Sequence, residues 1–404
     1  MGRRQTTLLV LLLGSSILAQ LALGKSKKPA AFQMNEQKRA VHALNRLAFG
    51  PRPGDVERVV AMGVDRWIDQ QLRPEKIDDS ALENRLNALP TLRMTTRELV
   101  ENFPPEQVIK AIADGKQSLP ADPLKRAVYE AELERYVEKQ ERKQEAPGAG
   151  ADSASGSEMM SNRGSEEDRM AAAETREALL DMTPDERFKK VLGMSPEQQR
   201  LLISSLRNRR DEFMEGMSPR QREILTALNN PQQVVRDELV QGKILRATYS
   251  ERQLQEVMTD FWFNHFNVFI GKGADRYLLA SYERDVIRPR ALGQFEDLLV
   301  ATAQSPAMLF YLDNWLSVGP NSDFANGIPK RTGHSRQTNK PRQSKRSGLN
   351  ENYGRELMEL HTLGVNGGYT QKDVTEVARV FTGWTLKEPN QGGGFTFDER
   401  KHEP

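Results

Sequence analysis

The residues of this chain best suited to acid–base or metal chemistry are a histidine and a glutamate that fall on apolar helix faces. Residues 258–269 read MTDFWFNHFNVF, and on a helix at about 100° per residue His265 lies in the middle of an apolar face. A buried imidazole resists protonation and needs a hydrogen-bond partner. Taken alone, this segment favours a core histidine that is satisfied by one hydrogen bond. The predicted apolar face consists of Leu254, Met258, Phe261, Trp262 and Phe269.

The glutamate is Glu356, within residues 349–361, which read LNENYGRELMELH. It lies at the edge of a predicted apolar stripe, where an unpaired carboxylate would have a raised pKa or would need a cation or a donor. Glu356 and Glu359, three residues apart, could also share a divalent metal. His265 or His361 could add a nitrogen ligand. Glu-x-x-Glu is common in helices, so the cofactor stays unknown at this point. The apolar stripe comprises Leu349, Tyr353, Leu357 and Leu360.

A polar cluster near the N-terminus has two interpretations. Residues 42–50 read HALNRLAFG and place His42, Asn45 and Arg46 on one side of a predicted helix. These side chains could form an anion clamp or a proton-transfer group, or they could be ordinary surface.

Arg355 belongs to a charge ladder. It follows Glu351 by four residues and precedes Glu359 by four, and a solvated helix face explains this spacing on its own. The chain contains no Gly-x-Ser-x-Gly elbow, no Gly-rich phosphate loop and no His-Glu-x-x-His motif. The common hydrolase, kinase and zinc-protease templates therefore find no support.

Two functions fit these residues. As an enzyme, the protein would be a hydrolase or a metal-dependent catalyst, with Glu356 or His265 as base and an arginine holding an anion. Alternatively, it is a non-catalytic secreted binding or assembly module in which the same residues form a structural network. The candidate catalytic residues are Glu356, His265, His42 and Arg355. The candidate binding residues are Asn45, Arg46, Asn264, Asn352, Glu359 and His361.

The elements that must position these residues are helices. Thr183, Ser195 and Ser218 each combine an N-cap hydroxyl with Pro at the next position and Glu or Gln two residues further on. Thr370 and Asp373 form an acidic variant of the same capping box. We find no sustained alternating strand pattern. We therefore expect a mainly α fold, a multi-helical bundle-like globular domain with long disordered insertions.

Composition supports a globular core and excludes several classes. The chain has 404 residues, 37% of them hydrophobic and none of them Cys, so it is no disulfide scaffold, Cys-ligated metal protein or thiol enzyme. Lys and Arg number 58 against 56 Asp and Glu, a net charge of +2, which does not indicate a nucleic-acid binder.

Two segments interrupt the helical pattern. Residues 141–173 are poor in apolar side chains and rich in Gly, Ser and charge, which predicts a disordered linker or insertion. Residues 317–347 form a polar loop with seven cations and no acid between positions 330 and 346. It could grip an anionic polymer, but without interleaved aromatic residues a solvated loop is favoured, with His334 exposed. The helical parts are then 25–140, 174–316 and 348–404.

The N-terminus resembles a secretory signal. Arg3 and Arg4 precede the apolar run 8–23, and small residues favour cleavage after Gly24, which makes 1–24 a signal peptide. An uncleaved anchor is the alternative. No later segment approaches 18 apolar residues, so we expect no membrane span after cleavage. The expected location is the periplasm, the outer surface or the extracellular space.

Three stretches resemble the bacterial domain-of-unknown-function 1800 family: 42–51 (HALNRLAFGP), 258–269 and 349–385 (LNENYGRELMELHTLGVNGGYTQKDVTEVARVFTGWT). His402 matches a further position. The longest stretch is the most specific, and the resemblance spans most of the mature chain apart from the linker and the basic loop. It implies an exported, largely helical protein whose activity is not established.

The resemblance also implies a partner. Family members are often encoded beside a second exported family, numbered 1501 and similar to sulfatases. The family pattern continues with a His-Asp pair and a Lys-Gly region where this sequence ends at 402–404. We therefore expect a truncated product or a fragment, with an incomplete motif region at 348–404. Substrate, reaction and oligomeric state stay unknown.

Overall fold

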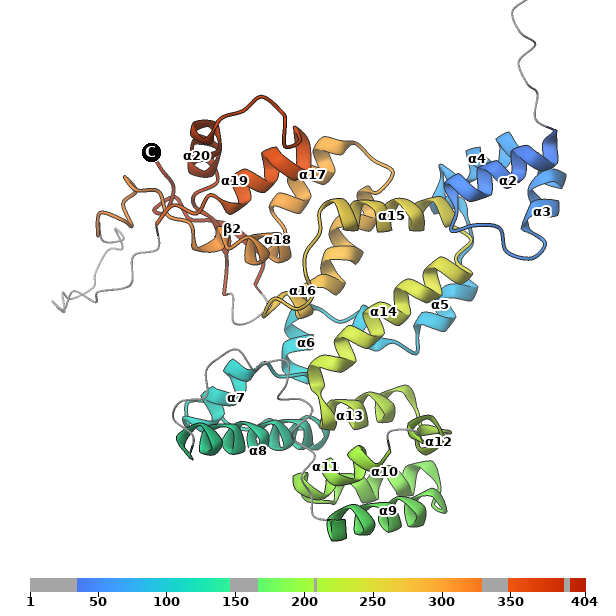
Figure 1. The fold of residues 1–404 in the computed structure, drawn as a ribbon, viewed down its shortest axis with the longest axis vertical. Coiled ribbons are helices and arrows are strands. Elements are labelled where there is room, and N and C mark those ends of the chain that lie inside the picture. Colours follow the sequence, from blue (N-terminus) through green and yellow to red (C-terminus); the bar gives the residue numbers. More distant parts are fainter. Residues whose placement is uncertain (1–34, 146–165, 207–208, 329–347, 389–392) are drawn as a thin grey trace, which may run out of the picture. The chain divides into compact units, whose positions relative to one another are not determined.

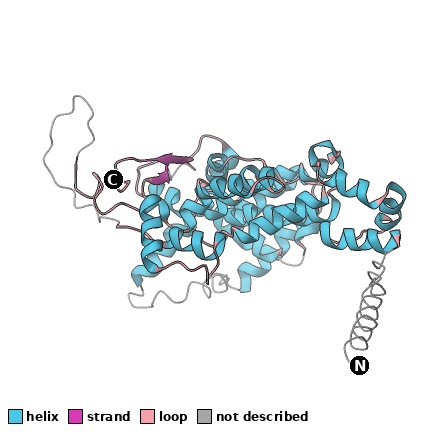
Figure 2. Ribbon diagram, turned by 90° about the horizontal axis from the view of Figure 1, so that it is seen from above, coloured by secondary structure: helices cyan, strands magenta, loops and turns pink. Residues whose placement is uncertain are grey.

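A computed structural model describes residues 35–145, 166–206, 209–328, 348–388 and 393–404 (Figure 1). Within these ranges the regular structure is helical apart from one short antiparallel strand pair (Figure 2), which confirms the mainly α class. The expected signal peptide at 1–24, residues 146–165 of the predicted linker and residues 329–347 of the basic loop lie outside the described residues. Among the helices of the described ranges, none is both long and apolar enough to cross a membrane.

The first of two compact units comprises residues 1–69. Its described helices are α2 (Glu36–Leu47), α3 (Asp55–Met62) and α4 (Val64–Gln71), the last of which runs two residues past the unit boundary. The side chain of Asn35 accepts a hydrogen bond from the backbone of Lys38 and so begins α2. The unit buries a small apolar core that includes Leu44, Val59 and Trp67.

The second unit, residues 70–404, is described by itself. Before α14 it contains η1 (Pro74–Lys76), α5 (Ser80–Leu86), η2 (Pro90–Leu92), α6 (Thr96–Asn102), α7 (Glu106–Ala113), α8 (Pro123–Glu145), α9 (Glu166–Leu180), α10 (Pro184–Leu192), α11 (Pro196–Ser205), α12 (Arg210–Met214) and α13 (Pro219–Asn229). It continues with α14 (Pro231–Tyr249), α15 (Gln253–His265), α16 (Asp275–Ser281), η5 (Tyr282–Ile287), η6 (Arg288–Arg290), α17 (Phe295–Ala303), α18 (Pro306–Tyr311), η7 (Asn314–Leu316), α19 (Asn352–Glu356), η8 (Leu357–Thr362) and α20 (Gln371–Val380). Of these, η5 and η8 are π-helices.

The four predicted capping boxes are confirmed. Thr183, Ser195 and Ser218 begin α10, α11 and α13, and each hydroxyl accepts a hydrogen bond from the backbone N–H three residues on. Thr370 begins α20 in the same way, with Asp373 bonding back to it. These starts are predictable because a capping box is complete within four residues.

Helices reach further into residues 141–173 than composition indicated. α8 continues to Glu145, and α9 already begins at Glu166. The end of α8 consists of Glu, Lys, Gln and Arg, which are strong helix formers in spite of their polarity. The first turn of α9 carries three acids, which interact favourably with the helix dipole. Low apolar content therefore did not mean absence of helix at these flanks.

The second unit has two main apolar cores. Phe213 belongs to the core built largely from α8 to α13, and Tyr353 to the core built largely from α15 to α19. α14 takes part in both, because Val235 packs in the first core and Leu239 in the second. Helices on either side of α14 are thus connected through one continuous element.

The last described residues pack onto the start of the predicted basic loop. β1 (Trp384–Leu386) pairs antiparallel with β2 (Phe395–Phe397), and the chain then returns toward Gly319. The backbone N–H of Gly319 donates to the carbonyl of Lys401 at 2.8 Å, and a Cβ at Gly319 would lie 2.7 Å from the Cα of Glu403. Only glycine permits this close approach. The carboxylate of Glu403 also accepts a hydrogen bond from the backbone N–H of Asn321 at 2.9 Å.

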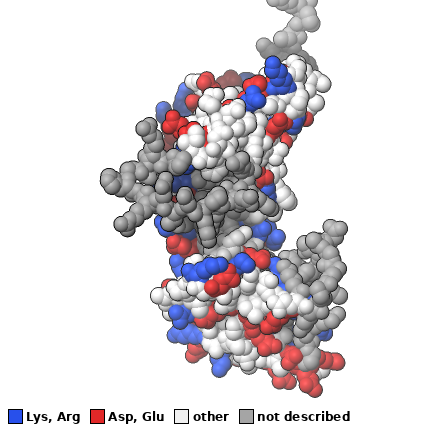
Figure 3. Space-filling model, turned by 90° about the vertical axis from the view of Figure 1, so that its left-hand side faces the viewer, with Lys and Arg blue, Asp and Glu red and all other residues white. Residues whose placement is uncertain are grey.

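Charges of both signs are interspersed on the surface. Figure 3 shows one face, on which Lys and Arg lie beside Asp and Glu among the described atoms. Exposed pairs such as Arg209 with Glu177, at 2.6 Å, are part of this mixture. The pattern agrees with the small net charge of +2.

Candidate functional site

Three of the predicted site residues belong to the first unit. His42, Asn45 and Arg46 are exposed on α2, whereas Ala43 and Leu44 between them are buried. Arg46 lies in the last turn of the helix, where a cation interacts favourably with the helix dipole. Ordinary helix surface is therefore a sufficient explanation of this cluster.

In the second unit, the structure brings two predicted histidines together. His265 is the last residue of α15, and His361 lies in η8. The Nε2–H of His265 donates to the backbone carbonyl oxygen of His361 at 3.0 Å, and the ring centroids are 6.3 Å apart. Because a carbonyl can only accept, this contact places a proton on Nε2 of His265. The histidine pair thus connects two segments that are 96 residues apart in the sequence.

The π-helical geometry of η8 decides which side chains face inward. The backbone N–H of Leu363 donates to the carbonyl of Met358, five residues back, at 3.0 Å. This wider turn buries Met358 and His361 and leaves Leu360 exposed. The prediction that Leu360 shares a buried face with Tyr353 was wrong, because it assumed α-helical spacing throughout.

His361 is held in a neutral state by its surroundings. Its side chain is 6% exposed and lies among aromatic rings, with the Phe266 centroid at 5.0 Å and the Tyr353 centroid at 6.4 Å. Burial lowers the pKa of His361 to about 4, and the neighbouring His265 acts in the same direction. A neutral imidazole near pH 7 packs as an aromatic ring rather than as a cation.

The two predicted acidic ligands are not joined to the histidines. Glu356 and Glu359 are half-buried, and within the described ranges the side chain of Glu356 makes no hydrogen bond or ion pair. Burial raises the pKa of Glu356, and the nearby Glu359 adds to the effect. Among the described residues, no group of three or more His, Asp or Glu side chains is arranged to hold a metal ion.

The remaining candidates have local roles. Arg355 donates from Nη2 to Oε1 of Gln371 at 2.9 Å and lies 3.4 Å from Glu351, so it fastens α19 to the first turn of α20. The exposed side chain of Asn264 donates to a carbonyl one turn earlier in α15 at 2.8 Å. Asn352 is exposed at the start of α19. None of these contacts requires a ligand.

Four large apolar side chains that adjoin the histidine pair in space or in the sequence remain exposed. Phe261 stacks toward His265 with centroids 6.2 Å apart, and Phe295 lies 6.5 Å from the same ring. Leu360 and Leu363 stand on either side of His361 in the sequence. Exposed fractions are 51% for Phe261, 42% for Phe295 and 57% for each of the two leucines. We call these four residues the apolar surface.

The predicted inner face of α15 is partly wrong: Leu254 is buried and Trp262 packs against the core as predicted, but two phenylalanines are exposed. Phe261 points out, and Phe269 lies beyond the helix end and is also exposed. Polar residues such as Glu256 and Thr259 are buried in their place, together with Phe263. The inner face of α15 differs from the predicted one because its buried Glu256 pairs with a charged network from another segment.

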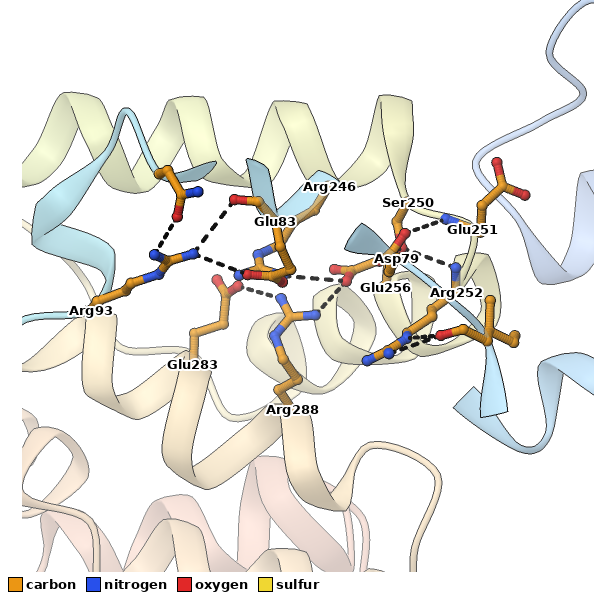
Figure 4. A network of polar contacts seen from close by, with 12 residues as sticks. Asp79, Glu83, Arg93, Arg246, Ser250, Glu251, Arg252, Glu256, Glu283 and Arg288 are labelled. Atoms are coloured by element: carbon orange, nitrogen blue, oxygen red, sulfur yellow. Dashed lines mark hydrogen bonds and ion pairs between the residues drawn. The ribbon is translucent and has the colours of Figure 1, made fainter. Parts of the chain in front are cut away.

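That network is built around Arg288 (Figure 4). Arg288 forms ion pairs with Glu256 and with Glu283, the latter at 2.8 Å, and all three side chains are largely buried. Arg246 lies 3.8 Å from Glu256, and Lys243 lies 3.5 Å from Glu283. Buried charges persist when each has a partner, so the network fixes α14, α15, η5 and η6 together. Its members are too scattered in the sequence to have been predicted.

Asp79 binds the backbone and a side chain just after the C-terminal end of α14. Its carboxylate accepts hydrogen bonds from Oγ of Ser250 at 2.7 Å and from the backbone N–H of Glu251 at 2.8 Å (Figure 4). Both contacts lie at the junction of α14 and α15, whose direction they fix.

The fold and this site define a helical protein with a hydrogen-bonded histidine pair next to exposed apolar side chains. The chain belongs to the family described as "Protein of unknown function (DUF1800)", whose model matches residues 42–404. Comparison with curated proteins and with solved structures found no match.

Proposed function

We propose that this protein is an exported, non-catalytic binding module that docks a partner protein through the apolar surface. The observation that supports the proposal is the exposure of Phe261 and Phe295, whose rings lie near His265, and of two leucines that flank His361 in the sequence. Soluble proteins rarely expose contiguous apolar patches larger than a few hundred square ångströms, and such patches often mediate association.

The histidine pair gives this surface a rigid base. The hydrogen bond from His265 to the carbonyl of His361 joins α15 to η8, and the ring contacts of Phe261 and Phe295 with His265 tie their side chains to that base. A preorganised surface loses little conformational entropy on binding. Because His361 is neutral near pH 7, docking does not have to desolvate a charge beneath the surface.

The partner in this proposal is a sulfatase-like exported protein of the family numbered 1501. The basis for this choice is the family resemblance, and export rests on the signal-like residues 1–24. The protein would then act outside the cytoplasm as an assembly partner of a hydrolase-like protein.

The binding proposal is tested with a double variant, Phe261→Ser with Leu360→Ser. Both side chains are exposed, so we expect the variant to fold and to bind the purified sulfatase-like protein at least about tenfold more weakly in biolayer interferometry. The control is Val240→Ser with Ile244→Ser, which removes two exposed apolar side chains of α14, 50% and 60% exposed. Equal binding by both double variants and the wild type would contradict the proposal.

A catalytic role is the second candidate, and one observation favours it. Glu356 is half-buried, its side chain has no hydrogen-bond or ion-pair partner in the described ranges, and its pKa is raised. A base whose pKa lies closer to neutral pH is the better proton acceptor. If the protein is a hydrolase or a metal-dependent enzyme with this base, Glu356→Gln should reduce turnover by about 100-fold or more and leave partner binding unchanged.

A further inference from the structure

A cavity in the second unit contains two glutamates that the histidine site does not use. It lies between α12, α13, α14 and the turn before η2 and has a volume of about 330 Å³. This volume is at the lower end of the range for small-molecule sites. Glu223 of α13 and Glu238 of α14 both line it.

Glu238 is anchored through one of its carboxyl oxygens. Oε2 accepts hydrogen bonds from the backbone N–H of Thr91 at 2.9 Å and from its hydroxyl at 2.7 Å. The side chain is 9% exposed, and burial raises the pKa of Glu238 to about 7 in spite of these donors. Oε2 is therefore fixed, and no hydrogen bond within the described ranges engages Oε1.

Glu223 repeats this arrangement with a different partner. Its Oε2 accepts a hydrogen bond from Nη1 of Arg220 at 2.6 Å, while the residue is only 3% exposed. Oε1 of Glu223 is buried and has no hydrogen-bond partner among the described residues. A buried carboxyl oxygen without a donor is costly, so this atom indicates a missing hydrogen-bond donor.

The rest of the cavity favours a cation with a short apolar part. Its charged lining comprises four acids and two arginines, and Arg210 is already engaged with the hydroxyl of Thr226 at 2.7 Å. Leu89, Met214 and Val234 supply apolar walls. The charged lining residues are Arg210, Asp211, Arg222, Glu223, Asp237 and Glu238.

We propose that this cavity binds a small primary amine in its ammonium form. The ammonium group would donate to Oε1 of Glu238, the nearby buried carboxyl of Glu223 would add negative charge, and the alkyl part would pack against the apolar walls. An ammonium has three donors and no acceptor, which matches a cavity where Glu238 has one carboxyl oxygen without a partner among the described residues and a second carboxyl group lies nearby. The inference is independent of the docking surface and of any role of Glu356.

The direct test is calorimetric titration of the purified chain with n-butylammonium chloride. We expect saturable binding that is weakened about tenfold or more by Glu223→Gln and by Glu238→Gln, because each removes a charge and keeps the shape. Glu215→Gln is the matched control, since Glu215 is exposed and does not line the cavity. Butan-1-ol and butyrate, of similar size, should bind far more weakly. Failure of butylammonium to bind, equal affinity in all variants, or tighter binding of butyrate would overturn the proposal.

A second measurement on the wild type keeps the test decisive if a variant does not fold. A bound cation lowers the pKa of a nearby carboxyl, so binding should release protons between the ordinary glutamate pKa of 4.5 and about 7. Affinity should increase with pH across this interval. Titration in buffers of different ionisation enthalpy measures the release. The charges facing Glu238 are those of the cavity lining, and Arg220 additionally faces Glu223. Absence of proton release, or weaker binding at higher pH, would contradict the proposal.

Discussion

The histidine pair and the carboxylate cavity bury ionisable groups in the same unit with opposite results. Burial lowers the pKa of His361 to about 4 and raises the pKa of Glu238 to about 7. The principal cause is the same in both regions, because a low-dielectric environment disfavours the charged form of either group. Both regions therefore tend toward neutral side chains at mildly acidic pH.

What differs is the use of hydrogen-bonding capacity. In the histidine region, the contact from His265 to the carbonyl of His361 is satisfied, and aromatic rings fill the surroundings. In the cavity, Oε1 of Glu223 is left without a donor. Burial of an ionisable group can thus build a rigid support or prepare a ligand site. Among the described residues, the buried atom without a partner is a carboxyl oxygen of Glu223 in the cavity and the hydroxyl of Tyr353 in the histidine region, so the charge that the unsatisfied group can carry distinguishes the two outcomes.

The largest expected effect comes from a fixed charge in the histidine region. His361→Lys should lower the free energy of unfolding by more than about 3 kcal/mol, because an ammonium would be buried among aromatic rings without a partner. Urea denaturation measures the loss. His42→Lys, on the exposed face of α2, is the control and should change stability by less than about 0.5 kcal/mol. Similar losses in both variants would remove the distinction between the two histidines.

The contribution of the histidine region to the free energy of unfolding should decrease in acid. The folded-state pKa of His361 is depressed, so its contribution to stability is present above pH 6.5 and is lost as the pH falls toward about 4. In the His361→Phe variant, the free energy of unfolding should therefore decrease by roughly 2–3 kcal/mol less than in the wild type over the same pH interval. Thermal unfolding of wild type and variant across the interval provides the measurement. Parallel profiles would show that His361 does not titrate in this way.

The cavity should respond to pH with the opposite sign. The folded-state pKa of Glu238 is raised, so its contribution is favourable below pH 4.5 and is lost as the pH rises through about 7. Glu238→Gln keeps an acceptor for Thr91 and should gain roughly 2–3 kcal/mol over the wild type at the upper end of the interval. The same unfolding series measures this gain. A variant that is less stable than the wild type near neutral pH would contradict the proposed cost of the buried carboxylate.

The smallest stability effect is expected at the apolar surface. Leu360→Ser should change the free energy of unfolding by less than about 0.5 kcal/mol, because the side chain is mostly exposed. Met358→Ser, two residues earlier and buried, should cost several times more. Equal losses would mean that η8 does not turn Leu360 outward.

Sequence patterns predicted local features well and long-range ones poorly. The capping boxes at Thr183 and Thr370 are confirmed because all of their groups lie within four residues. Leu360 was assigned to the wrong side because a π turn changes the helical phase and has no signature in hydrophobic spacing. Phe261 was assigned inward because Arg288, which draws Glu256 to the inner face of α15, lies 32 residues away.

The sites show the same limit. The approach of His265 to His361 follows from packing between segments 96 residues apart, and only the residue types suggested it. No sequence pattern indicated Glu223 and Glu238 as site residues, since the donor that holds Glu238 comes from Thr91, 147 residues earlier. A helical spacing predicts which side chains share a face but does not predict which segment will cover that face.

The most direct test of the account is site-specific photo-cross-linking at the apolar surface. A benzoylphenylalanine introduced at position 261 should form a covalent adduct with the purified sulfatase-like protein on irradiation. The same group at position 244, on the exposed side of α14, should not. Adducts of equal yield from both positions, or from position 244 alone, would contradict the proposal that this protein docks its partner through the surface around His265.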